Sequence, residues 1–314
     1  MRAVIDCTGG IPEYRSASSD ISALPDVSVG YDGLLMPLVD RPFLQHVLEK
    51  CVSLGVSTAE IIVDENEEAI RKVLGNGRRW GCTLNFHRVR PQAPLISVAE
   101  ALTGSPSDPC LIAAGHCIPT LGATGASTQV AYVDRVSGDW TGWAMATCAS
   151  ATSLCLVGFN ASGASLIRGL CAVHYCEQMI SCETPKALLR AQRALLEGKA
   201  EGLLMTGREI MAGVRLGRNA TVHPSATLIA PVYVGENCRI GAGVTLGPNS
   251  VVCRDCIVDR GNIVEESLIC SGTFVGEELE VRSALVQGNL VINTQIGSAT
   301  EVTDPCLLSR LPAA

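Results

Sequence analysis

An aliphatic residue recurs every six positions in the C-terminal third of the chain, and this period constrains the fold more than any other feature. After one such run the register shifts by one residue and the period resumes. A short repeat with one aliphatic residue per unit is typical of a parallel β-helix, whose interior those side chains fill. We therefore predict a β-helix over residues 221–300. The interior residues would be Val222, Leu228, Val234, Ile240, Leu246, Val252, Ile257, Ile263, Ile269, Val275 and Val281.

Before about residue 200 the pattern is different, because short apolar runs alternate with amphipathic segments. The last of these segments, TPKALLRAQRALLEG, predicts a helix with Thr184 as N-cap, Pro185 in the first turn and Gly198 at its end. Alternating strands and helices predict a mostly parallel sheet with right-handed crossovers. We predict an α/β domain over 1–200, a linker over 201–220 and a tail over 301–314. The predicted strands contain AVID, AEIIVD, CTLNFHRV and CLIAAG, and the earlier helices contain PFLQHVLEKCVSLG and ENEEAIRKVLG.

Charge and composition exclude several classes of protein. The formal net charge is -7 at pH 7 and the Lys and Arg residues are scattered, which argues against a nucleic-acid partner. Residues 140–167 carry no charge but are rich in Ser, Thr, Gly and Asn, so we predict buried sheet and loop rather than a membrane span. The opening segment MRAVIDCTGG contains Asp6 within its apolar run, which excludes an ordinary signal peptide. We expect a cytoplasmic protein with no membrane partner.

Fifteen cysteines are dispersed along the chain. An odd number of dispersed cysteines without a secretory signal predicts small buried side chains in a reducing compartment rather than a disulfide framework. Cys253 and Cys256 form the one C-x-x-C pair, and no second pair of zinc ligands lies at a suitable spacing. We therefore expect no metal at this pair.

Together, the two halves resemble sugar-1-phosphate nucleotidyltransferases, such as the mannose-1-phosphate guanylyltransferase and glucose-1-phosphate thymidylyl- or uridylyltransferase groups. The resemblance implies a Rossmann-like, GT-A-like α/β nucleotidyltransferase domain followed by a left-handed parallel β-helix of hexapeptide repeats. It also implies a reaction in which a sugar 1-phosphate and a nucleoside triphosphate give a nucleotide-sugar and pyrophosphate, assisted by Mg²⁺. It rests on the order and spacing of MRAVIDCTGG, LLMPLVDRPFLQHVLEKCVSLGV, AEIIVD, GNGRRWGCTLNF, CLIAAGH, ETPKALLRAQRALLEG and the repeats.

The same resemblance implies where the functional residues of the family fall. The lysine of the family falls on Gly33, one metal-binding aspartate falls on His116, and the second falls near Ser181. The segment APLISVAEAL has no glycine where the family contacts the base. The Gly-rich loop of the family is partly kept, and its arginine has a counterpart two positions late. The expected nucleotide-binding remnants are Thr8, Gly9, Gly10, Arg15 and His116.

These replacements favour a chain that has lost catalysis. An imidazole such as that of His116 suits zinc or nickel better than Mg²⁺, which prefers oxygen ligands. We expect a regulatory, nucleotide-sugar-sensing or scaffolding subunit without a cofactor, Mg²⁺ being needed only for residual activity. It would form a homo-oligomer, or a hetero-oligomer with a nucleotidyltransferase homologue, through the β-helix. The alternatives are an active nucleotidyltransferase with a rearranged site and a hexapeptide acyltransferase with His223 as base.

Overall fold

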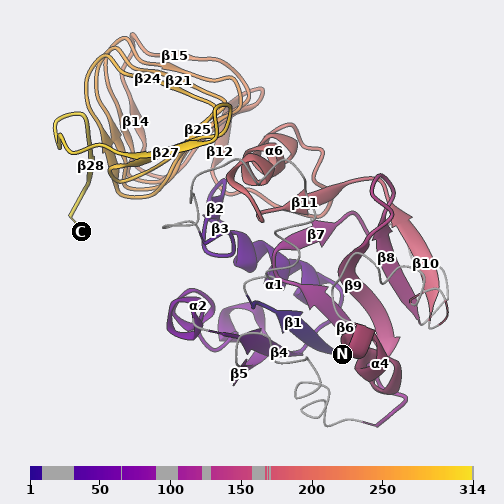
Figure 1. Ribbon diagram of the computed structural model, residues 1–314. Helices are drawn as coiled ribbons and strands as arrows, with labels where there is room; N and C mark the ends of the chain where they lie inside the picture. Colours follow the sequence, from indigo (N-terminus) through magenta and orange to yellow (C-terminus); the bar gives the residue numbers. More distant parts are fainter. Residues whose placement is uncertain are drawn as a thin grey trace. The chain divides into compact units, whose positions relative to one another are not determined.

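The computed structural model contains two compact units, each built from two stretches of the chain (Figure 1). The α/β unit comprises Met1–Ser22 and Phe43–Ser181, and the β-helix unit comprises Ala23–Pro42 and Cys182–Ala314. The division therefore falls at residue 182 and not at about 200, because the last predicted helix packs with the β-helix unit. The residues that the structure describes are 1–8, 32–64, 66–89, 105–121, 129–157, 167, 169 and 171–312.

The α/β unit is built on one mixed sheet with the strand order β10-β8-β9-β6-β1-β4-β5 in its described part. Strand β9 runs antiparallel to both of its neighbours, and the other pairs are parallel. The four strands expected from the sequence correspond to β1, β4, β5 and β6. The strands are β1 (Arg2–Asp6), β4 (Thr58–Val63), β5 (Thr83–Arg88), β6 (Pro109–Ala114), β8 (Val130–Asp134), β9 (Trp140–Thr147) and β10 (Ala172–Cys176).

Helices and a small second sheet complete this unit. Helices α1 (Phe43–Ser53) and α2 (Glu67–Leu74) form where the amphipathic patterns predict them, and α1 buries the face that carries Phe43 and Val47. A 3₁₀ helix covers Arg78–Trp80. Strand β7 (Cys117–Pro119) pairs antiparallel with β11 (Met179–Ser181).

The uncharged stretch 140–167 contains a helix that the sequence did not predict. It forms β9 and then α4 (Cys148–Val157), which packs on the sheet through Cys148, Ala151 and Leu154. Small, uncharged residues on all sides gave no amphipathic signal for this helix. Among the described residues, no helix combines the length and the apolar composition that crossing a membrane requires.

Three sheets of short strands form the sides of the β-helix, and their inter-coil pairs are parallel (Figure 1). The first sheet contains β12 (Arg208–Met211), β13 (Val214–Leu216), β16 (Val232–Val234), β19 (Ser250–Val252), β22 (Leu268–Ile269), β25 (Ala284–Gln287), β26 (Leu290–Asn293) and β27 (Ser298–Glu301). The second contains β14 (Thr221–Val222), β17 (Arg239–Ile240), β20 (Ile257–Val258), β23 (Thr273–Val275) and β28 (Leu308–Arg310). The third contains β15 (Thr227–Leu228), β18 (Thr245–Leu246), β21 (Ile263–Glu265) and β24 (Glu280–Arg282).

The interior of the β-helix corrects the predicted register. Val258 and Val264 lie in the buried interior, whereas Ile257 and Ile263 are half-buried. The six-residue period therefore continues to Val264, and the shortening by one residue comes before Ile269. Each Ile-Val pair is aliphatic at both positions, so periodicity could not decide which residue faces inward. The interior columns are Val222, Ile240, Val258 and Val275; Leu228, Leu246, Val264 and Val281; and Val234, Val252, Ile269 and Val286.

The predicted linker and tail are parts of the β-helix unit. Residues 201–220 include β12 and β13, which form a hairpin at the start of the first sheet. Residues 301–314 include β28, which pairs antiparallel with β23. Both were predicted as connecting segments because the aliphatic period is absent there.

Helix α6 (Pro185–Leu196) and a hairpin from the N-terminal part of the chain also belong to this unit. Thr184 caps α6, since its Oγ1 accepts a hydrogen bond from the N–H of Ala187 at 3.1 Å. The hairpin pairs β2 (Pro37–Leu38) with β3 (Arg41–Pro42). The Arg41 guanidinium donates to the carbonyl oxygen of Leu204 at 2.5 Å, and the N–H of Thr206 donates to Asp40 Oδ2 at 2.9 Å.

Candidate functional site

Three titratable residues lie at the carboxyl ends of the neighbouring strands β4, β1 and β6. Asp6 ends β1, Asp64 follows β4, and His116 lies in the turn after β6. Asp6 is paired in register with residues of both neighbouring strands and interacts electrostatically with His116 and Asp64. We call these three residues the strand-end cluster. Open α/β sheets bind ligands at this edge.

Asp64 was not singled out from the sequence. It ends the run AEIIVD, and its position directly after a predicted strand was the available signal. Its partner in the cluster, Asp6, lies on the central one of the three strands. The order of the strands in the sheet determines which side chains meet at its edge. This order is known only from the folded structure.

Asp6 is held in a setting that disfavours its charge. Desolvation is the largest influence and raises the pKa of the carboxyl group above its usual value. Two hydrogen bonds from Thr8 oppose this effect, one from its N–H at 3.0 Å and one from its hydroxyl at 2.7 Å, both to Asp6 Oδ1. The charge of His116 also lowers the pKa, whereas that of Asp64 raises it. Thr8 is thus engaged with Asp6.

The turn that carries His116 is fixed by a buried tryptophan. The indole N–H of Trp143 lies 3.2 Å from the carbonyl oxygen of Ala114 and 2.8 Å from that of Cys117, on either side of the turn. The N–H of Gly115 donates to the carbonyl oxygen of Asp6 at 2.7 Å. His116 is therefore placed by backbone contacts, and sequence reasoning missed this role of Trp143.

Ser181 lies close in the fold to the turn of His116. In the β7–β11 pair Ser181 is opposite Cys117, the residue after His116. The two positions that the resemblance assigns to metal-binding aspartates are thus brought near each other, although they are far apart in sequence. One is an imidazole and the other a hydroxyl.

Gly33 lies in the β-helix unit, and its surroundings exclude a side chain. A Cβ atom at Gly33 would overlap the carbonyl oxygen of Cys182. Backbone atoms cannot move aside cheaply in a packed interior. The position that the resemblance assigns to a lysine is therefore closed to lysine in this fold.

The remaining predicted site residues cannot be placed. Gly9, Gly10 and Arg15 lie outside the described residues, as does the segment APLISVAEAL. Their expected contact with a nucleotide stays a prediction.

The described residues do not fit the magnesium ion that the resemblance implies. Among them, no group of three or more His, Cys, Asp and Glu side chains could hold a metal. Mg²⁺ requires several oxygen ligands in near-octahedral geometry, and the strand-end cluster offers the desolvated carboxyl group of Asp6, the carboxyl group of Asp64 and the imidazole of His116. The expectation of no resident metal stays a prediction.

The cysteines pack as small buried side chains. The fourteen cysteines whose side chains the structure describes are unbridged, and all of them but Cys171 and Cys306 are buried. In the C-x-x-C pair, Cys256 contacts the carbonyl oxygen of Cys270 and Cys253 contacts that of Val39. These thiols thus bind backbone carbonyls rather than a shared ligand.

His223, the base of the acyltransferase alternative, has a local structural partner. Its Nδ1 lies 2.8 Å from the Ser225 hydroxyl and accepts the Ser225 N–H at 3.2 Å. The same hydroxyl accepts the N–H of Gly243 in the next coil at 3.0 Å. The histidine therefore supports a turn, and this arrangement does not favour acyl transfer.

A second polar cluster lies on β4 and β5. Glu60, 4% exposed, accepts Asn85 Nδ2 at 3.1 Å and contacts His87 Nε2 at 2.6 Å. Both carboxylate oxygens have partners, which is what a buried carboxylate requires. The cluster is therefore explained by burial alone.

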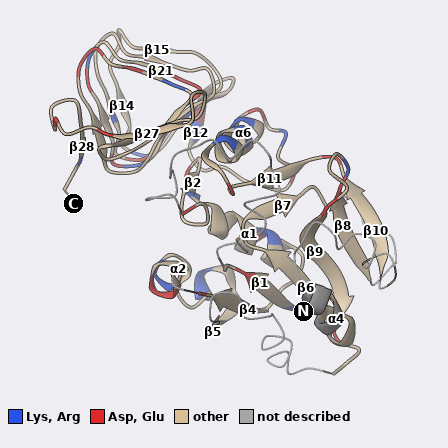
Figure 2. Ribbon diagram, viewed as in Figure 1, with Lys and Arg blue, Asp and Glu red and all other residues tan. Residues whose placement is uncertain are grey.

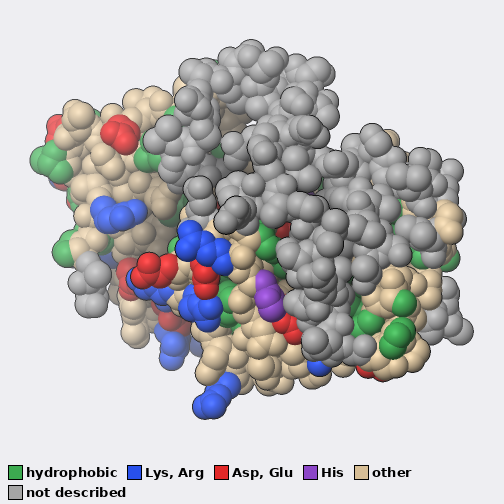
Figure 3. Space-filling model, turned by 60° about the horizontal axis from the view of Figure 1, so that its bottom comes forward, with side chains coloured by type: hydrophobic (Ala, Val, Ile, Leu, Met, Phe, Trp, Pro, Cys, Tyr) green, Lys and Arg blue, Asp and Glu red, His purple; other side chains and the backbone are tan. Residues whose placement is uncertain are grey.

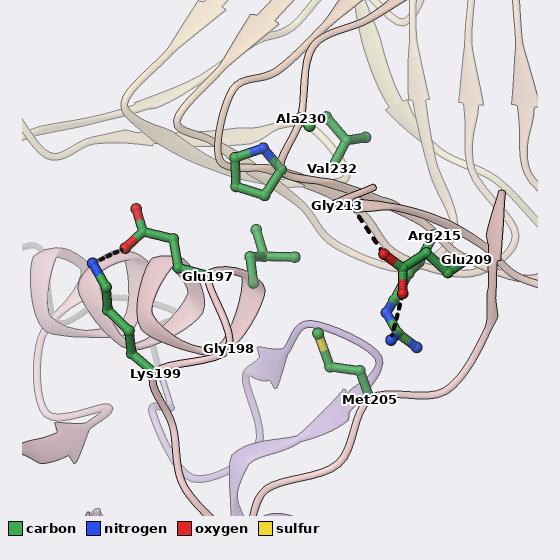
Figure 4. A pocket seen from close by; sticks show the side chains of 11 residues that line it. Glu197, Gly198, Lys199, Met205, Glu209, Gly213, Arg215, Ala230 and Val232 are labelled. Carbon is green, nitrogen blue, oxygen red and sulfur yellow. Dashed lines mark hydrogen bonds and ion pairs between the residues drawn. The ribbon is translucent and has the colours of Figure 1, made fainter. Parts of the chain in front are cut away.

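A pocket of about 600 Å³ lies within the β-helix unit, between the end of α6 and the β12–β13 hairpin (Figure 4). Met205 and Val232 contribute apolar surface. Its charges are paired, since Lys199 contacts Glu197 at 2.5 Å and Arg215 contacts Glu209 at 3.1 Å. Lys199 and Arg193 lower the pKa of Glu197. No predicted site residue lines this pocket.

Charges of both signs are interspersed over the described residues. Figure 2 shows Lys and Arg near Asp and Glu in both units, and on the face in Figure 3 basic side chains lie beside acidic ones. Examples are Arg71 with Glu67 at 2.8 Å and Arg218 with Glu236 at 2.9 Å. Whether the chain contacts nucleic acid is not tested by this distribution, and the expectation that it does not stays a prediction.

Comparison with known proteins supports the resemblance stated from the sequence. Residues 213–248 match the family model of the bacterial transferase hexapeptide (six repeats). A bifunctional protein GlmU from Pelobacter propionicus is 22% identical over 138 residues, which cover 41% of this chain and 29% of that protein. A UTP–glucose-1-phosphate uridylyltransferase from Synechocystis sp. is 26% identical over 114 residues, covering 36% of this chain and 29% of that protein.

A third curated relative and one solved structure are of the same type. A glucose-1-phosphate thymidylyltransferase from Actinoplanes sp. is 35% identical over 66 residues, covering 21% of this chain and 22% of that protein. A structure described as a glucose-1-phosphate thymidylyltransferase from Bacillus anthracis with sucrose has a TM-score of 0.47 and 13% identity, covering 66% of this chain and 98% of that one. The matched segments span less than a third of each curated relative. The chain is sugar-1-phosphate nucleotidyltransferase-like and carries hexapeptide repeats.

Proposed function

We propose that this chain is a nucleotidyltransferase-like subunit that does not transfer nucleotides. Its role in an assembly would be to regulate the other subunits, to sense a nucleotide-sugar or to act as a scaffold. Gly33 is the observation that supports this most. The position that would carry a phosphate-binding lysine is packed against the carbonyl of Cys182, so its loss is built into the fold. Phosphoryl transfer depends on positioned cations, and removing them lowers the rate severely.

The strand-end cluster adds a second argument. His116 replaces a carboxylate, and Asp6 is desolvated and bonded to Thr8. A carboxyl group whose pKa is raised and whose oxygen already accepts two hydrogen bonds is a poor ligand for Mg²⁺. Assembly through the β-helix and a cytoplasmic location are further parts of the proposal. The buried, unbridged thiols support a reducing compartment.

A second candidate is an active nucleotidyltransferase with a rearranged site. Asp64 favours it, because this residue brings a second carboxylate to the edge where Asp6 lies. The candidate requires Asp64 to take over the role of the missing aspartates.

One assay with two readouts separates the candidates. The protein is incubated with each nucleoside triphosphate, a panel of sugar 1-phosphates and Mg²⁺ or Mn²⁺, and pyrophosphate release is measured. We expect no release above that of the Asp64→Asn variant. Release by the wild type that Asp64→Asn abolishes would overturn the proposal and establish the second candidate.

The second readout is the shift in melting temperature on adding nucleotides or nucleotide-sugars. A shift that His116→Ala diminishes, without pyrophosphate release, supports a sensing role. No shift with any ligand supports a scaffold. The Asp64→Asn preparation controls for contaminating enzymes, which would give equal release in both samples.

A further inference from the structure

The pocket between the end of α6 and the β12–β13 hairpin has an ion pair on each of two walls. At the end of α6, Lys199 contacts Glu197. On the hairpin, Arg215 contacts Glu209. Figure 4 shows the two pairs on opposite sides of the pocket. Every residue that lines the pocket belongs to the β-helix unit, so the pocket shares no residue with the strand-end cluster.

In each ion pair one partner is less exposed than the other. The Glu197 side chain is 23% exposed, whereas that of Lys199 is 67% exposed. On the hairpin the order of charges is reversed, because the Arg215 side chain is 31% exposed and that of Glu209 is 46% exposed. Exposed ion pairs contribute little to stability, so Lys199 and Glu209 can leave these contacts at small cost. The better held groups are thus a carboxylate on one wall and a guanidinium on the other.

The end of α6 favours a cation beside Glu197. The helix ends at Leu196, and the last carbonyl groups of a helix carry a partial negative charge. Arg193 Nε donates to Glu197 Oε1 at 2.9 Å, which holds this carboxylate in place. Lys199 contacts the other oxygen, Oε2, from outside the helix. An ammonium group that replaces Lys199 would meet both Oε2 and the negative end of the helix.

The lining between the two charged walls is apolar. Its side chains come from α6, from the segment after it and from the start of β16: Leu196, Met205, Ala230, Pro231 and Val232. A methionine side chain adapts to the shape of what it contacts. A volume of about 600 Å³ is typical of sites for small molecules. The pocket therefore fits a ligand with an apolar body between two charged ends.

We propose that this pocket binds a small zwitterion whose ammonium and carboxylate groups lie at opposite ends of an apolar chain, such as an ω-amino acid or a short apolar peptide. The ammonium group contacts Glu197, the carboxylate contacts Arg215, and the chain packs on Met205. An α-amino acid carries both charges on one carbon atom and cannot reach both walls. This ligand site goes beyond the proposed function, which concerns nucleotides and assembly.

Isothermal titration calorimetry of the full chain with four matched probes tests the charge pattern. The probes are 6-aminohexanoate, its isomer 2-aminohexanoate, hexylamine and hexanoate. We expect 6-aminohexanoate to bind with a dissociation constant of about 1 mM or below, a value in reach of a ligand of this size. The other three should bind at least about tenfold more weakly, because each makes one charged contact fewer. Equal binding of the two isomers, or no saturable binding of 6-aminohexanoate, would overturn the inference.

Two variants assign the charged ends to their walls. Arg215→Gln should lower the affinity for 6-aminohexanoate to that for hexylamine and leave hexylamine binding unchanged. Glu197→Gln should lower it to that for hexanoate. Arg218→Gln is the matched control, because Arg218 is a surface arginine paired with Glu236 and lies outside the pocket lining. An equal loss in the control, or the same loss for every probe, contradicts the assignment.

Lys199→Ala gives a test that does not depend on losing affinity. Lys199 is largely exposed, so its removal should leave the fold intact, which circular dichroism checks. Because the ligand ammonium no longer competes with the lysine for Glu197, 6-aminohexanoate should bind more tightly. Weaker binding would contradict the proposed exchange of partners.

A fifth probe, leucyl-leucine, distinguishes the two sources of this chemistry. Tighter binding of this dipeptide than of 6-aminohexanoate indicates a peptide ligand, and the reverse order indicates an ω-amino acid. Binding of neither overturns the inference. Since no readout involves a nucleotide or pyrophosphate, this failure is distinct from a failure of the non-catalytic proposal.

Discussion

Gly33 shows how the packing of the backbone determines which side chains a position accepts. Its neighbour is a backbone carbonyl, that of Cys182, and not a flexible side chain that could rotate away. Because glycine has no Cβ atom, it permits this close approach. A lysine at this position would therefore disturb the fold.

The first prediction compares two glycines. Gly33→Ala should lower the free energy of unfolding by about 3 kcal/mol, because the new methyl group overlaps backbone. Gly138 has a φ of +77° and nothing within 4 Å of an added Cβ. Gly138→Ala should therefore cost only about 1 kcal/mol of backbone strain. Urea unfolding measures both, and equal losses would show that Gly33 is not sterically closed.

Ionisation of the buried Asp6 carboxyl group lowers the stability of the fold at neutral pH. Its pKa in the folded chain is raised above the ordinary value near 3.8 by desolvation. The unfolded chain therefore loses this proton first as the pH rises. Below that ordinary value the burial carries no ionisation penalty, and above it the fold loses stability until the folded-state pKa is passed.

The second prediction follows from this sign. Asp6→Asn should gain stability relative to the wild type as the pH is raised from about 4 to 7, because the amide cannot ionise. Urea unfolding across this range gives the difference. Thr8→Val removes the hydroxyl hydrogen bond that lowers the Asp6 pKa and keeps the backbone one, so it should steepen the loss of stability with rising pH in the Asp6-containing chain. A pH-independent difference between Asp6→Asn and the wild type would contradict the raised pKa.

At the scale of elements, the β-helix depends on which aliphatic residue of each pair faces inward. Val264 belongs to a column with Leu246 and Val281, and its neighbour Ile263 is half-buried. Strand alternation puts successive side chains on opposite faces, so an error of one residue exchanges interior and exterior. The hydrogen bonds between coils determine which residue of each pair faces the interior.

The third prediction tests this register. Val264→Ala should destabilise the chain by about 2–3 kcal/mol, since it leaves a cavity in a packed interior. Ile263→Ala removes more side-chain atoms but should lose only about 1 kcal/mol, because much of that surface is already in water. Thermal or urea unfolding of the two variants ranks them. The reverse order would restore the register expected from periodicity.

At the scale of the whole molecule, a stretch from the N-terminal part of the chain belongs to the β-helix unit. Residues 32–42 precede most of the α/β unit in sequence but pack with the β-helix unit. Asp40 anchors this stretch, because it accepts the N–H of Thr206 at 2.9 Å and contacts Arg41 Nε at 3.3 Å. Its side chain is 4% exposed. Folding of the C-terminal unit therefore depends on a segment near the N-terminus.

The fourth prediction concerns this anchor. Asp40→Ala should lower the free energy of unfolding by about 2 kcal/mol, because it removes the carboxylate that accepts the Thr206 N–H and contacts Arg41. Hydrogen exchange should increase at 204–206 and in the β-helix. Glu277→Ala is the control, since its contact with Arg260 is on the surface of the same unit and should contribute little. An increase confined to the α/β unit would contradict the assignment of this segment.

The sequence by itself determined the two architectures, the capped helix α6 and the type of protein that the chain resembles. These follow from local patterns: a six-residue period, alternating strands and helices, and a Thr-Pro start at residue 184. The roles expected for Thr8, Arg15, His116 and Ser181 stay predictions.

Tertiary structure decided what no local pattern contains. It selected Val258 and Val264 over their isoleucine neighbours, joined residues 32–42 to the β-helix unit, and brought Asp64 beside Asp6. It also placed a carbonyl against Gly33. Each outcome depends on hydrogen bonds and contacts between segments far apart in sequence, and periodicity describes only the order of residues within one segment.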